Sequence, residues 1–83
     1  MEENKIAVFG IGRVGLPLAL VLADKGFFVT GIDVDNYKLS LLKHKIMPFL
    51  EEGAQPLLEK HIGKNFQVFS QDHTQRVISE NQT

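Results

Sequence analysis

The residues best suited to chemistry form one glycine-rich run, Gly10-Ile11-Gly12-Arg13-Val14-Gly15. Their spacing is G-x-G-x-x-G, which binds the pyrophosphate of a dinucleotide when it follows a strand and opens a helix. In this pattern Gly10 permits the tight turn and Gly12 lets the backbone approach a diphosphate, while Gly15 allows close helix packing. The helix amino terminus adds amide hydrogens and the positive end of its dipole. For Arg13 two interpretations stay open, a cation beside the pyrophosphate and a side chain in water.

An acidic residue, Asp33, stands at the end of the next predicted strand, at close to the ~20 residues after the glycines that this motif uses. A carboxylate there can accept hydrogen bonds from both hydroxyls of the adenosine ribose, and its charge repels a 2′-phosphate. The next residue is Val34, so no arginine beside Asp33 in the sequence receives such a phosphate. The constellation therefore favours NAD over NADP. The alternative is a purely structural role, in which the glycines form only a tight turn and Asp33 belongs only to a surface turn.

Alternating apolar patterns predict the elements that position these residues. Short apolar and β-branched runs predict strands, helical spacing of leucines predicts helices, and Asp35 is the expected N-cap of the second helix. The expected strands are 5–9, 27–32 and 66–70, and the expected helices are 14–25, 36–44 and 56–61, with a loop at 46–53 and a helical turn after Asp72. We expect Val14, Leu18, Val21 and Leu22 to form the apolar stripe of the first helix, and helices to cover both faces of the first strand.

This order predicts an α/β fold, the first mononucleotide-binding half of a Rossmann domain. Its parallel three-stranded sheet has the order 3-2-1, with helices on the faces, and residues 1–83 form one truncated half-domain. The edge of the first strand, from Ile6 to Phe9, would then be exposed. We therefore expect a homo-oligomer, for example through two first strands that pair antiparallel.

Composition excludes several classes of function. The formal net charge of −1 and the dispersed lysines argue against a nucleic-acid partner. No apolar stretch approaches the ~20 residues of a membrane helix, so we expect no membrane partner and a cytoplasmic location. The sequence has no cysteine, and its three histidines lack metal-ligand spacing, so we expect no metal and no catalytic thiol.

The stretch from Lys5 to Ala19, together with Gly31-Ile32-Asp33-Val34-Asp35, resembles the UDP-sugar dehydrogenases, which act on UDP-glucose or UDP-N-acetylmannosamine. The resemblance extends to Lys38, and Pro48, Glu51 and Gly53 resemble the family's proline-glutamate-glycine loop. It implies that Asp33 and Lys38 both contact the adenosine end of NAD. Arg13 departs from the family, where a tyrosine is common at this position.

The resemblance also implies what this chain lacks. Family members are several hundred residues long and oxidise a sugar alcohol to a carboxylate in two NAD-dependent steps, through a thiohemiacetal on a cysteine. With no cysteine, the chain is expected to be the NAD-binding portion of such an enzyme and inactive by itself. Three alternatives stay open: a stand-alone nucleotide-sensing module, a hydroxyacid-type dehydrogenase and a self-associating structural fragment with a vestigial site.

Overall fold

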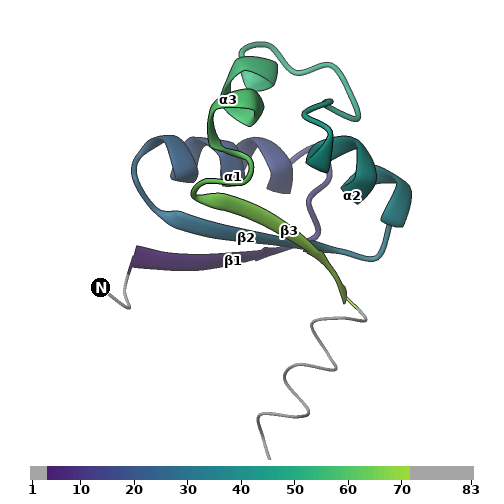
Figure 1. Ribbon diagram of the computed structural model, residues 1–83, viewed down its shortest axis with the longest axis horizontal. Coiled ribbons are helices and arrows are strands. Elements are labelled where there is room, and N and C mark those ends of the chain that lie inside the picture. The colour runs from purple at the N-terminus through teal and green to yellow at the C-terminus, as the bar shows by residue number, and fades with distance from the viewer. Residues whose placement is uncertain (1–3, 72–83) are drawn as a thin grey trace, which may run out of the picture.

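The computed structural model describes residues 4–71, and the helical turn expected after Asp72 lies outside them. Strands and helices alternate along most of the chain (Figure 1). In chain order the elements are β1 (Lys5–Phe9), α1 (Gly15–Asp24), β2 (Phe28–Asp33), α2 (Asn36–Lys43), α3 (Ala54–His61) and β3 (Phe66–Ser70). The strands pair in parallel in the order β1-β2-β3, so the predicted fold class and strand order are confirmed.

The three helices of residues 4–71 lie on the same side of the sheet (Figure 1). Consecutive right-handed crossovers that move in one direction across a sheet place their helices on one face. The burial of β1 agrees with this, because Ile6 and Val8 are partly buried whereas Ala7 and Phe9 are exposed. The expectation that helices cover both faces of the first strand is therefore wrong for the residues described. The second face would need a crossover in the opposite direction.

The core lies between the sheet and the helices. Leu16 and Leu20 of α1, Leu42 of α2, Leu58 of α3 and Phe66 of β3 are fully buried. Each such side chain contributes about 1.5–3 kcal/mol relative to exposure. The burial of Leu39 and Leu42 on α2 follows the helical pattern expected from the sequence.

The buried stripe of α1 differs from the one expected. Its buried residues are Leu16, Ala19, Leu20 and Ala23, whereas Leu18 and Val21 are about half exposed and Val14 is 82% exposed. The helix is apolar around most of its circumference, so periodicity alone could not select the packed face. The small residues Gly15, Ala19 and Ala23 recur at intervals of about one helical turn, and both alanines are buried.

The third helix begins two residues earlier than the sequence predicted. Its N-cap is Gly53, whose φ is +81°, and Pro56 lies within the first turn. A proline is tolerated there because the first amides of a helix have no partner inside it. Pro56 thus follows the start of the helix and does not mark it.

Candidate functional site

The glycine turn connects the carboxyl end of β1 to the first turn of α1. Gly10 has φ = +84°, a conformation that favours glycine, and its amide donates to the carbonyl of Ile32 at 2.7 Å. A Cβ atom on Gly15 would overlap the Gly10 carbonyl oxygen, so only glycine fits where α1 meets the turn. Both residues shape the turn in the way that the sequence pattern predicts.

The space beside Gly12 is open. A Cβ atom built on Gly12 would meet no atom of the described chain within 4 Å, and the Gly12 carbonyl accepts the first helical bond from Leu16 at 2.9 Å. Within residues 4–71 the amides of Gly12, Arg13 and Val14 have no hydrogen-bond partner. Unpaired amides at the amino end of a helix attract an anion. The turn therefore fits the diphosphate of a dinucleotide.

Asp33 joins the two loops that follow β1 and β2. Its Oδ2 accepts from the Ile11 amide at 3.0 Å and from the Lys38 ammonium at 3.1 Å, and its Oδ1 accepts from the Asp35 amide at 3.0 Å. The side chains of Asp33 and Lys38 are only 10% and 20% exposed. The structure thus brings the glycine turn, the acid and the lysine together at the carboxyl edge of the sheet, where parallel α/β sheets bind ligands.

The charge of Asp33 is stabilised by this environment. Partial burial alone would raise its pKa, but the hydrogen bonds from the Asp35 amide, the Lys38 ammonium and the Ile11 amide outweigh burial, and the pKa lies below its ordinary value. Asp33 is therefore ionised at neutral pH. It can accept a hydrogen bond from a ribose hydroxyl and cannot donate one.

Two of the predicted site residues, Ile11 and Val14, make no side-chain hydrogen bond at the turn. The Ile11 side chain is fully buried, and its amide is already used by Asp33. The Val14 side chain is 82% exposed, and Val14 is the N-cap of α1 without a side-chain hydrogen bond. Ile11 therefore positions Asp33, and Val14 offers its amide to the site.

Arg13 is exposed to solvent, and it pairs with no acid of the described chain. Its guanidinium carbon lies 5.0 Å from the centroid of the Phe49 ring, a cation–π contact. The two side chains line one hollow of about 320 Å³ beside the glycine turn, together with Gly12, Asp35, Tyr37, Lys38, Leu41 and Pro48. Sequence reasoning missed Phe49. The only available signal was its place in the 46–53 loop.

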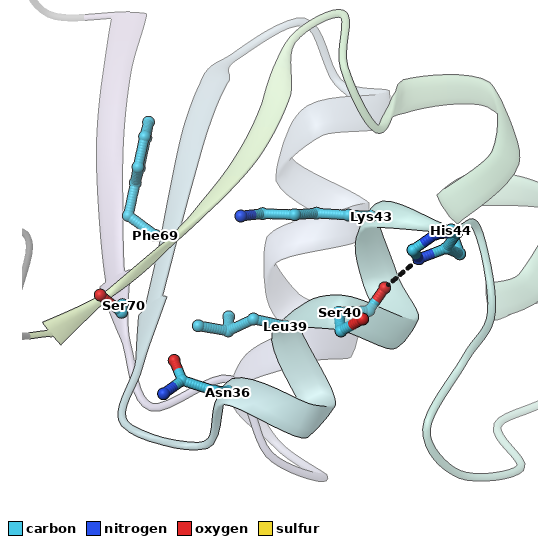
Figure 2. A pocket seen from close by; sticks show the side chains of 7 residues that line it. All are labelled: Asn36, Leu39, Ser40, Lys43, His44, Phe69 and Ser70. Carbon is cyan, nitrogen blue, oxygen red and sulfur yellow. Dashed lines mark hydrogen bonds between the residues drawn. The ribbon is translucent and has the colours of Figure 1, made fainter.

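A larger hollow of about 520 Å³ lies between α2 and β3 (Figure 2). Lys43 extends across it toward Phe69, and Asn36 points toward Ser70, whereas His44 lies at its rim with Nδ1 2.8 Å from the Ser40 carbonyl. None of the predicted cofactor-binding residues lines it. It is thus separate from the glycine turn.

A second polar cluster lies at the opposite, amino-terminal edge of the sheet. His61 of α3 has Nδ1 at 2.8 Å from the Asn65 Oδ1 and Nε2 at 3.0 Å from the Asp24 Oδ1. Asn65 also donates to the carbonyls of Ala23 and Phe27, at 2.8 and 3.1 Å. This cluster ties α3 to the end of α1 and the start of β2.

Residues 4–71 contain neither a metal-ligand cluster nor a membrane-spanning helix. No group of three or more histidine, cysteine or acidic side chains there could hold a metal ion. None of the helices in this part has the length and apolar character that a bilayer span requires.

Comparison with known proteins links this geometry to one family. Residues 4–81 match the family model described as the UDP-glucose/GDP-mannose dehydrogenase family, NAD binding domain. Among curated proteins, the chain is 48% identical over 60 residues to an uncharacterized protein of Methanocaldococcus jannaschii, covering 72% of this chain and 7% of that protein. It is 39% identical over 57 residues to the UDP-N-acetyl-D-mannosamine dehydrogenase of Methanococcus aeolicus, covering 69% and 13%.

A solved structure shares both fold and sequence. The crystal structure of a ternary complex of the GDP-mannose dehydrogenase from Pseudomonas aeruginosa superposes with a TM-score of 0.71 at 31% identity, covering 77% of this chain and 15% of that one. The chain thus spans only 7% to 15% of the length of these relatives.

Proposed function

The chain belongs to the UDP-glucose/GDP-mannose dehydrogenase family, and we propose that it binds NAD through its glycine turn and is not catalytic by itself. The observation that carries this proposal is the hydrogen bond of 3.0 Å from the Ile11 amide to Asp33. It fixes the acid beside the turn whose amides are unpaired. The diphosphate and the adenosine ribose therefore have adjacent partners.

The glycine turn is assigned the diphosphate. The amides of Gly12, Arg13 and Val14 donate to its oxygens, and the missing side chain of Gly12 leaves room for them. Gly10 and Gly15 shape the turn and make no contact of their own. NAD, when bound, supplies the hydride acceptor, and this chain binds and orients its adenosine half.

Asp33 and Lys38 are assigned the ribose. A carboxylate offers about four lone pairs, and three of those of Asp33 are already used. One ribose hydroxyl can therefore bind Oδ1 without displacing anything. The ammonium of Lys38 keeps two further hydrogens and donates to the second hydroxyl. In this assignment Asp33 and Lys38 bind one hydroxyl each, whereas the sequence-based hypothesis has Asp33 bind both hydroxyls.

The absence of catalysis rests on the residue inventory. The chain contains no cysteine, so it has no thiol on which a thiohemiacetal could form. Only a few pyrophosphate and ribose contacts are available, so we expect a dissociation constant on the order of 0.1–1 mM. The cytoplasmic location stays a prediction.

The proposal is tested by titrating the ¹⁵N-labelled chain with NADH and NADPH and following its backbone amides by NMR. We expect shifts at Gly12 and Arg13 with NADH, and weaker binding of NADPH because the charge of Asp33 repels a 2′-phosphate. Asp33→Ala should weaken NADH binding about tenfold, since it removes a charge-assisted hydrogen bond.

A matched control is Glu52→Ala, which removes the same charge from an exposed loop position. It should leave both dissociation constants unchanged. Asp33 also links two loops, so the spectrum of the Asp33→Ala variant must first show an intact fold. Equal binding of the two cofactors by the wild type, or an unchanged NADH affinity in folded Asp33→Ala, would refute the ribose assignment.

A specific observation also favours self-association. In the described part of the chain β1 pairs only with β2, and its outer edge from Ile6 to Phe9 carries no neighbour. Phe9 is 65% exposed and Ala7 is exposed as well. We propose that two β1 edges pair, which unpaired apolar edges favour.

Sedimentation of the chain across a wide concentration range tests this pairing. The wild type should show a dimer, and Ala7→Lys should shift it toward the monomer because two lysines would meet near the paired edges. A monodisperse wild-type monomer at high concentration would eliminate the pairing and leave the NAD assignment untouched.

A further inference from the structure

The cation–π contact joins two segments that are far apart in the sequence. Arg13 belongs to the glycine turn, and Phe49 belongs to the loop that connects α2 to α3. Their separation of 5.0 Å lies within the ~6 Å over which a guanidinium and an aromatic ring attract each other. The 46–53 loop therefore reaches the edge of the anion site.

The side chain of Gln55 holds the start of the 46–53 loop through two hydrogen bonds. The Gln55 side-chain oxygen accepts from the Met47 amide at 3.1 Å, and its nitrogen donates to the Lys45 carbonyl at 2.6 Å. Met47 and Phe49 are partly buried and pack against the core, whereas Leu50 is 97% exposed. The Phe49 ring is thus held in place while the adjoining residue projects into solvent.

A guanidinium can stack and donate at the same time. It is planar, so one face can lie on an aromatic ring while the hydrogens at its rim remain in the plane and available to phosphate oxygens. A free arginine would lose much of its rotamer freedom on binding, and stacking in advance lowers that cost. Lysine, a point charge on a flexible stem, would not be organised in this way.

We propose that Phe49 is a positioning residue, which holds the Arg13 guanidinium beside the unpaired amides of the glycine turn as an additional cation for the diphosphate of the dinucleotide. The inference rests on the proposed function and adds the 46–53 loop to the site. It follows from the shared hollow that Gly12, Arg13, Lys38 and Phe49 line. Binding of the dinucleotide then stabilises the loop through Arg13.

A double-mutant cycle with NADH as the probe tests the proposal. Arg13→Met should raise the dissociation constant about five- to tenfold, as the loss of one hydrogen bond of ordinary net strength does at an exposed position. Phe49→Leu should raise it about threefold, because the cation remains and only its platform is lost. Phe49→Leu in the Arg13→Met background should change nothing further, since Phe49 acts through Arg13. Phe49→Tyr keeps an aromatic ring beside the guanidinium and should have the dissociation constant of the wild type.

Leu50→Ala is the matched control on the same loop, and we expect it to leave NADH affinity unchanged. The dependence of NADH affinity on salt concentration is a second readout, and a loss of packing alone would not change it. The affinity of the wild type should fall with rising ionic strength, and that dependence should be weaker in Arg13→Met, which retains the fold but lacks the cation.

The outcomes separate this inference from the proposed function. If Asp33→Ala weakens NADH binding and Arg13→Met does not, this inference is overturned and the proposed function is not. Additive effects of the Arg13 and Phe49 substitutions on NADH affinity would also overturn it, because Phe49 would then act independently of Arg13. Failure of the wild type to bind NADH would overturn the proposed function and this inference with it.

Discussion

Two aspartates of this chain, Asp33 and Asp24, have similar chemistry and different tasks. Each accepts hydrogen bonds, each lies beside a lysine, and each has a pKa below its ordinary value. Asp33 lies at the carboxyl edge of the sheet, where the Gly12, Arg13 and Val14 amides have no partner within residues 4–71. Asp24 lies at the other edge, and its partner His61 has both ring nitrogens engaged.

The difference is what each cluster leaves unsatisfied. No buried side-chain nitrogen or oxygen of the described chain lacks a hydrogen-bond partner, and the side-chain hydrogen bonds of His61 and Asn65 all go to other groups of the fold, so we call the cluster around Asp24 closed. The cluster around Asp33 is equally well bonded, but it borders an open hollow. A polar cluster at a sheet edge thus stabilises the fold when it is closed. It becomes a binding site when backbone donors beside it stay free.

The largest expected effect separates packing from binding within the glycine turn. Gly15→Ala should lower the free energy of unfolding by at least about 3 kcal/mol or prevent folding, because its Cβ would overlap the Gly10 carbonyl. Gly12→Ala should keep the fold, since nothing lies within 4 Å of its Cβ, yet weaken NADH binding. Urea denaturation and NADH titration check both. A stable Gly15→Ala variant would contradict the packing argument.

Breaking the closed cluster around Asp24 should lower the free energy of unfolding somewhat less than Gly15→Ala does. Asn65→Ala removes the bonds to His61, Ala23 and Phe27, and we expect a loss of about 2–3 kcal/mol in the free energy of unfolding. NADH affinity at a temperature where the variant is folded should not change. A variant that binds NADH several times more weakly would show that the two clusters are coupled.

The N-cap of α2 offers a smaller test next to the site. The Asp35 Oδ1 accepts from the Lys38 amide at 3.1 Å, so Asp35→Ala should cost about 1 kcal/mol. Asp35→Asn keeps an acceptor and should recover most of this loss in the same thermal melts. Equal melting temperatures for Asp35→Ala and the wild type would rule out the cap as a source of stability.

Acid should weaken both clusters gradually. For Asp24 the hydrogen bond from His61 is the main cause of the lowered pKa, partial burial opposes it, and the Lys60 charge adds to it. For Asp33, hydrogen bonds outweigh burial. A folded-state pKa below the unfolded one contributes stability above the unfolded pKa of about 4, and this stability is lost as pH falls through the folded pKa.

Urea denaturation between pH 7 and pH 2 measures this loss as a falling free energy of unfolding below about pH 4. Asp33→Asn and Asp24→Asn should each flatten part of the slope, because each removes one of the groups that titrate. Slopes equal to that of the wild type in both variants would contradict the assignment of the acid sensitivity to these carboxylates.

Much of the fold and the central part of the site could be predicted from local patterns. The strand before Gly10, the N-cap Asp35 and the order of the strands follow from apolar runs, glycines and capping residues. The buried face of α1 could not be predicted, because apolar residues surround that helix. The sequence of β1 alone could not predict that the helices cover only one face of the sheet in residues 4–71, because this depends on the direction of the crossovers.

The sequence by itself determined the glycine turn and the acid at the end of β2, because the backbone at Gly10 and Gly15 requires glycine and the acid follows at the spacing typical of the motif. Only the tertiary structure decided how they work together. It showed that Ile11 donates its amide to Asp33, that Lys38 shares that carboxylate, and that Arg13 lies on Phe49. These contacts depend on where parallel strands and their crossovers place distant segments, which spacing along the chain does not encode.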